Sequence, residues 1–88
     1  MDKNEISTFK EKLEAQHSFP GSYTFKFIVP VEKVVEVKAL FTEEEELIEK
    51  ASSKGNYKSI TARVLVNSSE EVVATYIEAK KIEGIISL

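Results

Sequence analysis

The segment at residues 57–66, YKSITARVLV, decides how this chain folds. Apolar and polar residues alternate along it, and successive side chains of a strand point to opposite faces of a sheet. The pattern therefore predicts a strand with one buried face and one face that meets solvent. The side chains expected to be buried are Ile60, Ala62, Val64 and Val66. Those on the outward side are Tyr57, Ser59, Thr61, Arg63 and Leu65.

A turn signal comes directly before this strand. Gly55 accepts a positive φ angle without steric penalty, so Gly55 and Asn56 suit a two-residue type II′ hairpin turn. The polar segment 46–53 ahead of the turn is then expected to be an edge strand, where weak alternation is tolerated. The residues of this hairpin motif are Ser52, Ser53, Lys54, Gly55, Asn56, Tyr57 and Ser59.

A second alternating segment lies further upstream, at residues 22–29, SYTFKFIV. It predicts the first strand of the sheet, with Lys26 and Ile28 on the outward side. The side expected to be buried carries Tyr23, Phe25, Phe27 and Val29. Pro30 is expected to stop this strand and to begin a helix over residues 31–41, where the apolar residues take a helical period.

The two ends of the chain supply the remaining elements. Residues 2–16 predict a helix whose narrow apolar stripe is Ile6, Phe9 and Leu13, with Asp2 and Glu5 as a capping pair.

Near the other end, Ser68 and Glu71 read as a capping box that opens a helix. Its buried stripe is expected to include Val72, Val73, Tyr76 and Ile77. Gly84 follows the helix, and residues 85–88 predict a short final strand.

These elements predict an α+β fold, a ferredoxin-like βαββαβ sandwich with an extra N-terminal helix. Because crossover connections are right-handed, the four-stranded antiparallel sheet is expected to have the order 4-1-3-2, with two helices on one face. We expect a single domain over residues 1–88. Residues 1–18 would form an N-terminal helical extension and residues 19–88 the ferredoxin-like core.

Composition narrows the classes of function. The 88 residues include no cysteine and one histidine, which excludes a disulfide scaffold, a thiolate zinc site and a cysteine nucleophile. The net charge is −3, whereas proteins that bind nucleic acid through its phosphates usually carry a basic excess. Neither a signal peptide nor a membrane-length apolar stretch is recognised, so a cytoplasmic protein without membrane contact is expected.

Three groups of residues resemble sites of chemistry, and each favours an ordinary structural role. His17 stands alone near a helix end. The glutamates at 43–46 lack the alternating oxygens and the glycine of a calcium loop. Ser52, Ser53 and Lys54 lie at an exposed hairpin tip, where a lysine is not desolvated as a serine–lysine pair requires. No catalytic residue, metal or cofactor is therefore predicted, and the chain is not expected to be an enzyme.

Several stretches resemble the YbeD-like proteins, which are small bacterial domains of uncharacterised function. The hairpin sequence SSKGNYxS at residues 52–59 is the most specific part of the likeness. Phe19-Pro20 followed by YxFKFI at residues 23–28 resembles the family's entry into its first strand, and IEGIISL at residues 82–88 resembles its closing strand. The resemblance covers about residues 19–88.

This resemblance implies a fold similar to ACT domains, the ligand-sensing modules of enzymes of amino-acid metabolism. ACT domains that bind amino acids usually place a glycine between the first strand and the first helix. In this chain the junction is Ile28-Val29-Pro30-Val31, and Pro30 has no N–H group. Amino-acid binding in the ACT manner is therefore in doubt.

We expect function to reside on the outward side of the sheet, with Lys26, Tyr57, Thr61 and Arg63 as the candidate binding residues. The expected function is that of a non-catalytic regulatory or interaction module. Its candidate partners are another protein, a small metabolite or a second copy of the chain in a homodimer.

Two alternatives remain open. The helix at residues 2–16 could cover the outward side of the sheet, because its apolar stripe must contact something. The fold is also that of RNA-recognition domains, and Lys54-Gly55 begins like their motif. However, that motif's downstream aromatic positions are Lys58 and Thr61 here, so a single-stranded RNA binder is the less favoured alternative.

Overall fold

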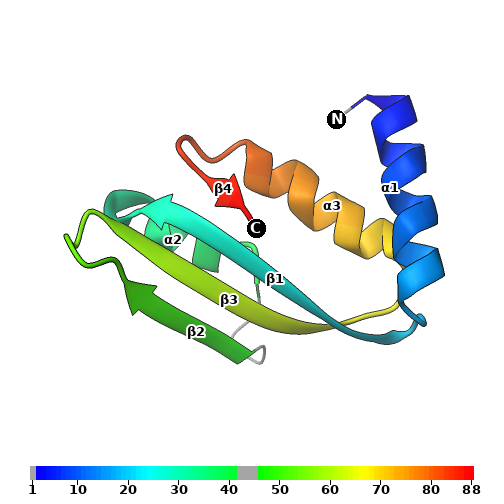
Figure 1. Cartoon of the computed structure of the whole chain (residues 1–88), viewed down its shortest axis with the longest axis horizontal. Coiled ribbons are helices and arrows are strands. Elements are labelled where there is room, and N and C mark those ends of the chain that lie inside the picture. Colours follow the sequence, from blue (N-terminus) through cyan, green and yellow to red (C-terminus); the bar gives the residue numbers. More distant parts are fainter. Residues whose placement is uncertain (1, 42–45) are drawn as a thin grey trace.

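The computed structural model describes residues 2–41 and 46–88. The sheet has four strands, and Figure 1 shows its long central pair with a shorter strand on either side and helices packed against it. In chain order the elements are α1 (Lys3–Gln16), β1 (Gly21–Pro30), the 3₁₀ turn η1 (Val31–Lys33), α2 (Val34–Lys38), β2 (Glu46–Ala51), β3 (Tyr57–Val66), α3 (Ser69–Lys80) and β4 (Ile86–Ser87).

The sheet has the order β2-β3-β1-β4, and every neighbouring pair is antiparallel. This confirms the predicted order, read from the other edge, and the α+β ferredoxin-like class. β1 pairs with β3 along all ten residues, so that Phe25 lies opposite Ala62 and Phe27 opposite Ile60. The two alternating segments of the sequence thus form the centre of the sheet, as predicted.

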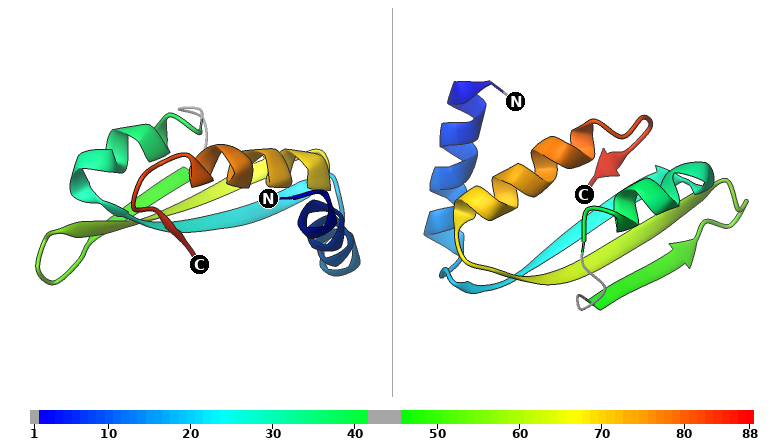
Figure 2. Two further views of the ribbon diagram at one scale, coloured as in Figure 1. Left: turned by 90° about the horizontal axis from the view of Figure 1, so that it is seen from above. Right: turned by 180° about the vertical axis from the view of Figure 1, so that it is seen from behind.

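Both α2 and α3 lie on the same side of the sheet (Figure 2). The side chains between them and the sheet are the ones that alternation assigned to the buried face. Phe25, Phe27, Ile60 and Ala62 are 0% exposed. Each aromatic or branched side chain removed from water contributes roughly 1.5–3 kcal/mol. The opposite side of the sheet meets no helix of the described residues (Figure 2).

The helix predicted over residues 31–41 is much shorter than expected. A 3₁₀ turn comes first, and the α-helix that follows spans only Val34–Lys38. Val34 and Val37 are buried whereas Val31 and Val35 are exposed. Valine is a poor helix former, so the α-helix persists only where packing on the sheet supports it. Pro30 ends β1 as predicted, but as the last paired residue of the strand.

The hairpin turn is also different from the prediction. Ser52 and Tyr57 close the hairpin through a 2.8 Å bond from the Ser52 N–H to the Tyr57 carbonyl, which leaves a loop of four residues instead of two. Gly55 has the expected positive φ, at 75°. However, its N–H donates back to the Ser52 carbonyl, which makes it the last residue of a turn that begins at Ser52. β2 accordingly ends at Ala51, two residues earlier than predicted.

The positions at which α1 and α3 begin were predicted correctly, but only one of the two predicted sets of capping hydrogen bonds is present. Asp2 caps α1 as expected, because its Oδ1 accepts the Glu5 N–H at 2.8 Å. Ser68 is the N-cap residue of α3, but its hydroxyl makes no capping bond. The Glu71 carboxylate instead accepts both the backbone and the side-chain N–H groups of Asn67. The capping box is therefore wrong, although the helix begins where it indicated.

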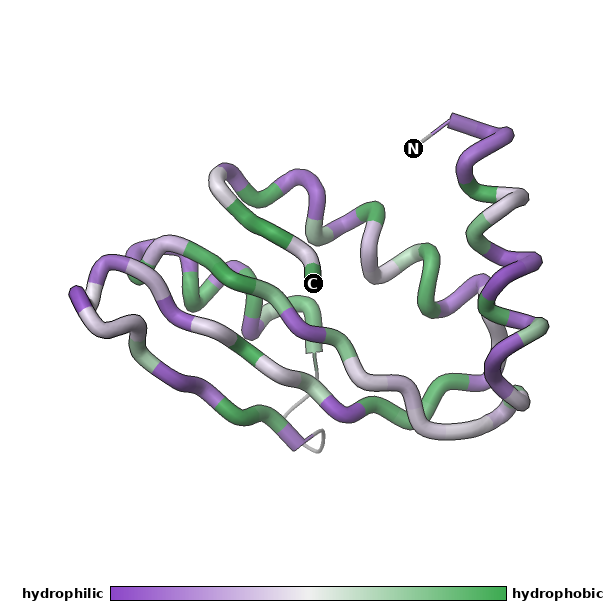
Figure 3. Tube along the Cα trace, viewed as in Figure 1, coloured by the Kyte–Doolittle hydropathy of each residue, from purple (hydrophilic) through white to green (hydrophobic). Residues whose placement is uncertain are grey.

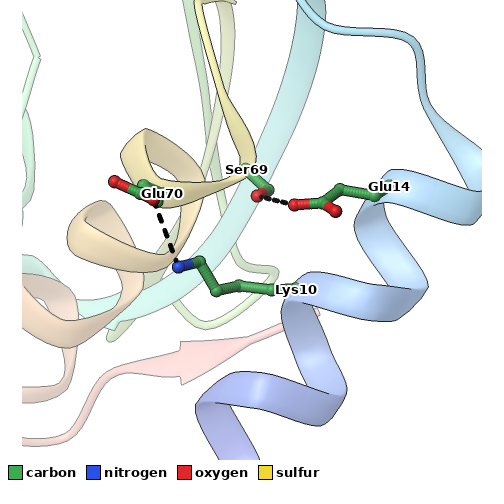
Figure 4. A network of polar contacts seen from close by, with 4 residues as sticks. All are labelled: Lys10, Glu14, Ser69 and Glu70. Carbon is green, nitrogen blue, oxygen red and sulfur yellow. Dashed lines mark hydrogen bonds and ion pairs between the residues drawn. The ribbon is translucent and has the colours of Figure 1, made fainter.

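α1 docks against α3 and leaves the outward side of the sheet uncovered. Figure 4 shows Lys10 reaching Glu70 and Glu14 reaching Ser69. The Ser69 Oγ donates to Glu14 Oε2 at 2.6 Å, and Lys10 Nζ lies 3.4 Å from Glu70 Oε1. Leu13 is buried in the common core, and Ile6 and Phe9 pack against it. The alternative in which residues 2–16 cover the outward side is therefore wrong.

None of the helices in the described residues combines the length and the apolar character that crossing a membrane requires.

Candidate functional site

The outward side of the sheet, called here the open face, consists of alternate residues from all four strands. Lys26 lies directly opposite Thr61, and Thr24 lies opposite Arg63. On the other flank of β3, Glu46 lies opposite Arg63. The register therefore brings three of the four predicted binding residues, Lys26, Thr61 and Arg63, into one cluster, while Tyr57 lies at the hairpin end of the same face.

Sequence reasoning missed the contributions of the two outer strands. Ile48 faces Thr61 and Lys50 faces Ser59 across β2 and β3, so both belong to the open face. Ile86 pairs with Ile28, and the Leu88 N–H donates to the Lys26 carbonyl at 2.9 Å. The weak alternation of residues 46–51 was the signal for the β2 residues. The residues of β4 had no comparable signal, because two paired residues are too few to show a period.

The open face is amphipathic. Its exposed apolar side chains are Ile48, Tyr57, Leu65, Ile86 and Leu88. Among its charged residues the cations outnumber the anions, since Lys26, Lys50 and Arg63 stand against Glu46 alone. This local basic excess contrasts with the net charge of −3 for the chain. In the colouring of Figure 3, hydrophobic and hydrophilic residues are correspondingly mixed along the strands.

Two shallow hollows lie on this face. One, of about 240 Å³, is lined by Thr24, Glu46, Ile48, Thr61 and Arg63. The other, of about 200 Å³, lies at the base of the hairpin and is lined by Ile28, Lys50, Ala51, Ser52, Tyr57, Lys58 and Ser59. Sites for drug-sized ligands usually enclose roughly 300–1,000 Å³. Both hollows are therefore smaller than the usual site of a drug-sized ligand.

The hairpin motif is divided between two roles. Ser52, Tyr57 and Ser59 line the second hollow. The remaining residues form the exposed loop itself: Ser53, Lys54, Gly55 and Asn56. The Ser52 hydroxyl accepts the Tyr57 N–H at 3.3 Å, and the Asn56 carbonyl accepts the Val31 N–H at 3.1 Å. These bonds give the motif a structural purpose, because they hold the hairpin against the end of β1.

The junction after β1 is unsuited to the usual ligand mode of ACT domains. Pro30 has no N–H group, and the N–H of Val31 is already bonded to Asn56. A Cβ atom added to Gly84 would lie 2.9 Å from Cγ of Pro30, so the segment before β4 packs tightly against this corner. The backbone donors that an amino-acid carboxylate would need are therefore missing at Pro30 and engaged at Val31.

The other residues considered for chemistry take ordinary positions. The His17 ring lies 5.2 Å from that of Tyr23 and 6.3 Å from that of Phe19, where it packs as an exposed aromatic neighbour. Of the glutamate run, residues 43–45 lie outside the described residues, and Glu46 is exposed on β2.

Two titratable groups on the covered side are perturbed. Lys38 Nζ lies 2.5 Å from Glu49 Oε2 and Lys58 Nζ lies 3.6 Å from Glu49 Oε1, and hydrogen bonding to Lys38 lowers the pKa of the Glu49 carboxyl. Burial raises the pKa of the Tyr76 hydroxyl, which also bonds to the Tyr23 hydroxyl at 3.1 Å. The Lys38–Glu49 and Tyr76–Tyr23 contacts each join a helix to the sheet, and Lys58–Glu49 joins two strands, so all three explain stability better than chemistry.

Comparisons with known proteins agree on one family. The family model described as "Protein of unknown function (DUF493)" matches residues 14–88. A UPF0250 protein of Shewanella halifaxensis is 34% identical over 80 residues, which cover 84% of this chain and 91% of that protein. A UPF0250 protein of Shewanella piezotolerans is 31% identical over the same shares of the two chains.

A shorter match of higher identity is found with a UPF0250 protein of Shewanella woodyi, 56% identical over 36 residues, or 41% of each chain. No solved structure is significantly similar. The family model and the relatives confirm the resemblance to YbeD-like proteins. The chain is therefore a member of DUF493, a family of small bacterial proteins whose function is unknown.

Proposed function

We propose that the chain is a non-catalytic interaction module with a regulatory role, and that its open face binds an acidic surface of a partner protein. The observation that carries this proposal is an amphipathic, locally basic sheet face that α1 leaves uncovered. Exposed apolar side chains beside charged ones are typical of a docking surface, and a basic patch favours an acidic partner.

The open shape of the hollows favours a protein over a small metabolite. The two hollows, of about 240 and 200 Å³, are shallow and open to solvent, so they would leave much of a bound metabolite's surface exposed. Each is large enough for one apolar side chain, such as a leucine, with a carboxylate near Arg63 or Lys50. We propose no catalytic role, because none of the open-face residues that the structure describes is a nucleophile hydrogen-bonded to a base.

The RNA alternative has less support. RNA-recognition domains stack two or three bases on aromatic side chains of the central strands. In this chain Phe25 and Phe27 are completely buried on the other face. Among the described residues of the open face, Tyr57 is the one aromatic side chain, and it lies at the end of β3.

Affinity capture with charge-matched variants tests the proposal. The wild-type chain, Arg63→Glu and Lys80→Glu would be immobilised and exposed to native cell extract at low salt. Lys80 is exposed on α3, so the two variants change the charge equally on different sides of the molecule. We expect Arg63→Glu to reduce capture of the partner at least ten-fold, whereas Lys80→Glu should retain it.

The partner must also elute with salt, since charge attraction between exposed groups is screened. Equal capture by Arg63→Glu and Lys80→Glu would refute the role of the open face. Light scattering of the same three proteins tests whether the partner is a second copy of the chain. If it is, Arg63→Glu should have a lower molar mass in solution than the wild-type chain and Lys80→Glu. If free amino acids raise the melting temperature of the wild-type chain and of both variants equally, this result would favour a small ligand at another site.

A further inference from the structure

The edge of β1 beyond β4 has no neighbouring strand within the part of the chain that the structure describes. β3 pairs with all ten residues of β1, but β4 pairs only with Phe27 and Ile28. One further bond, from the Leu88 N–H to the Lys26 carbonyl, ends this contact. Residues 21–25 have no strand partner on that side among the described residues, and the ribbon view from above shows this stretch between the C-terminus and α1 (Figure 2).

The backbone groups along this edge point outward. The carbonyl of Lys26 faces β4, and in an antiparallel strand the N–H and C=O groups of alternate residues face the same neighbour. The N–H and C=O groups of Ser22 and Thr24 therefore face the free edge. The side chains of both residues are exposed. Pro30 fits the same pattern. Any other residue at this position would direct its N–H group to this edge and not to β3.

The two edges of the sheet are protected differently. The β2 edge carries Glu46, Glu49 and Lys50, and Glu49 is bound by lysines from α2 and β3. Charged side chains are a common means of preventing another strand from pairing with an exposed edge. Along the free part of the β1 edge, the residues at or next to the outward-facing backbone groups are Gly21, Ser22 and Thr24. These three residues are small and uncharged. This edge lacks the charges that protect the other one.

One aromatic side chain, that of Tyr23, borders the free edge on its covered side. Tyr23 is half-buried, and its ring lies 5.2 Å from that of His17 and 6.3 Å from that of Tyr76. A strand added beside residues 21–25 would place every second side chain near Tyr23. Its other side chains would emerge on the open face beside Lys26.

We propose that residues 21–25 of β1 bind an extended segment of a partner protein, which adds a strand to the sheet in line with β4. The edge accommodates about five residues, or ~17 Å at ~3.3 Å per residue. The segment should alternate apolar residues, which contact Tyr23, with polar or acidic residues on the side of Lys26. Main-chain hydrogen bonds to Ser22 and Thr24 would provide the affinity. The main-chain groups that form this site lie at the edge of the sheet, beside the open face, and they do not depend on the function proposed for that face.

Hydrogen exchange followed by NMR tests the free edge in the wild-type chain. The amides of Ser22 and Thr24 should exchange much faster than those of Tyr23 and Phe25, which face β3. Equal protection of the four amides would overturn the proposal, because the outward groups would then have a partner already.

Peptide selection tests binding itself. Phage-displayed random 12-residue peptides would be selected on the wild-type chain and then measured against Thr24→Pro and Ala51→Pro. Proline removes one outward N–H from the β1 edge in the first variant and one from the β2 edge in the second. We expect selected peptides to bind Thr24→Pro at least ten-fold more weakly than the wild-type chain and to bind Ala51→Pro with wild-type affinity. Bound peptide should also slow the hydrogen exchange of the Ser22 and Thr24 amides in the wild-type chain.

Ser22→Pro serves as the second edge variant if circular dichroism shows that Thr24→Pro is unfolded. Recovery of no peptide, or of peptides that bind the β1-edge variants as tightly as the wild-type chain, would refute the site. Arg63→Glu should weaken peptide binding at the edge far less than Thr24→Pro does, because Arg63 lies on β3 and provides no backbone group of the β1 edge. Comparison of the two variants separates this result from the test of the open face.

Discussion

The covered face and the open face of the sheet are built from the same strands but follow different rules. Along β1, Phe25 and Phe27 are 0% exposed, while Lys26 between them faces solvent. On β3 the same contrast separates Ile60 and Ala62 from Leu65, which is 75% exposed. The large apolar side chains of β1 and β3 on the covered face are buried or packed against the core, whereas several on the open face are exposed.

This difference separates stability from binding. Burial of the covered face accounts for the fold, because apolar area removed from water is the main favourable contribution to folding. The exposed apolar side chains of the open face contribute little to it, so folding by itself does not require them there. The predictions below test this separation in order of the size of the expected effect.

The largest effect is expected from Phe27→Ala on the covered face. Removing a completely buried phenylalanine should lower the free energy of unfolding by about 3–5 kcal/mol, measured by urea denaturation followed by circular dichroism. Lys26→Ala is the control, since a change at an exposed neighbour should stay within about 0.5 kcal/mol. Similar losses from both variants would mean that the two faces are not energetically distinct.

Leu13→Ala tests whether α1 belongs to the covered face. Leu13 is 3% exposed and lies in the common core, so its truncation should lower the unfolding free energy by about 2–5 kcal/mol. Lys12→Ala, on the exposed side of the same helix, is the matched control. If Leu13→Ala were as stable as the control, α1 would be an appendage that the fold does not need.

Tyr76→Phe should have an intermediate effect. Loss of the hydroxyl pair between Tyr76 and Tyr23 should destabilise the chain by about 1 kcal/mol at neutral pH. Burial raises the pKa of Tyr76 in the folded chain, so its stabilising effect is complete below the ordinary tyrosine pKa of about 10 and declines as the pH rises above it. Denaturation between pH 8 and 11 should show this decline in the wild-type chain and a weaker one in Tyr76→Phe.

The smallest effect is expected on the open face. Leu65→Ser should change the unfolding free energy by less than about 0.5 kcal/mol, because a side chain that is 75% exposed loses little packing. The same variant should weaken capture of a partner by the open face. A loss of stability as large as that of Phe27→Ala would show that Leu65 is covered in solution.

Much of the candidate site could be predicted because alternation is a local property. The outward positions of Lys26, Thr61 and Arg63 followed from the period of two in their own segments, and the register then placed them together. Ile86 and Leu88 could not be assigned in this way, since their place on the open face depends on pairing with a strand some 60 positions away in the sequence.

The sequence by itself determined the two central strands, the side of each strand that is buried, the order of the sheet and the residues at which α1 and α3 begin. These features depend on local periodicity, capping residues and the handedness of crossover connections. The tertiary structure decided that α1 packs against α3, that α2 spans only Val34–Lys38 and that residues 21–25 of β1 pair with no described strand on the β4 side. Such features depend on which distant surfaces compete for the same apolar residues, and no local pattern records the outcome of that competition.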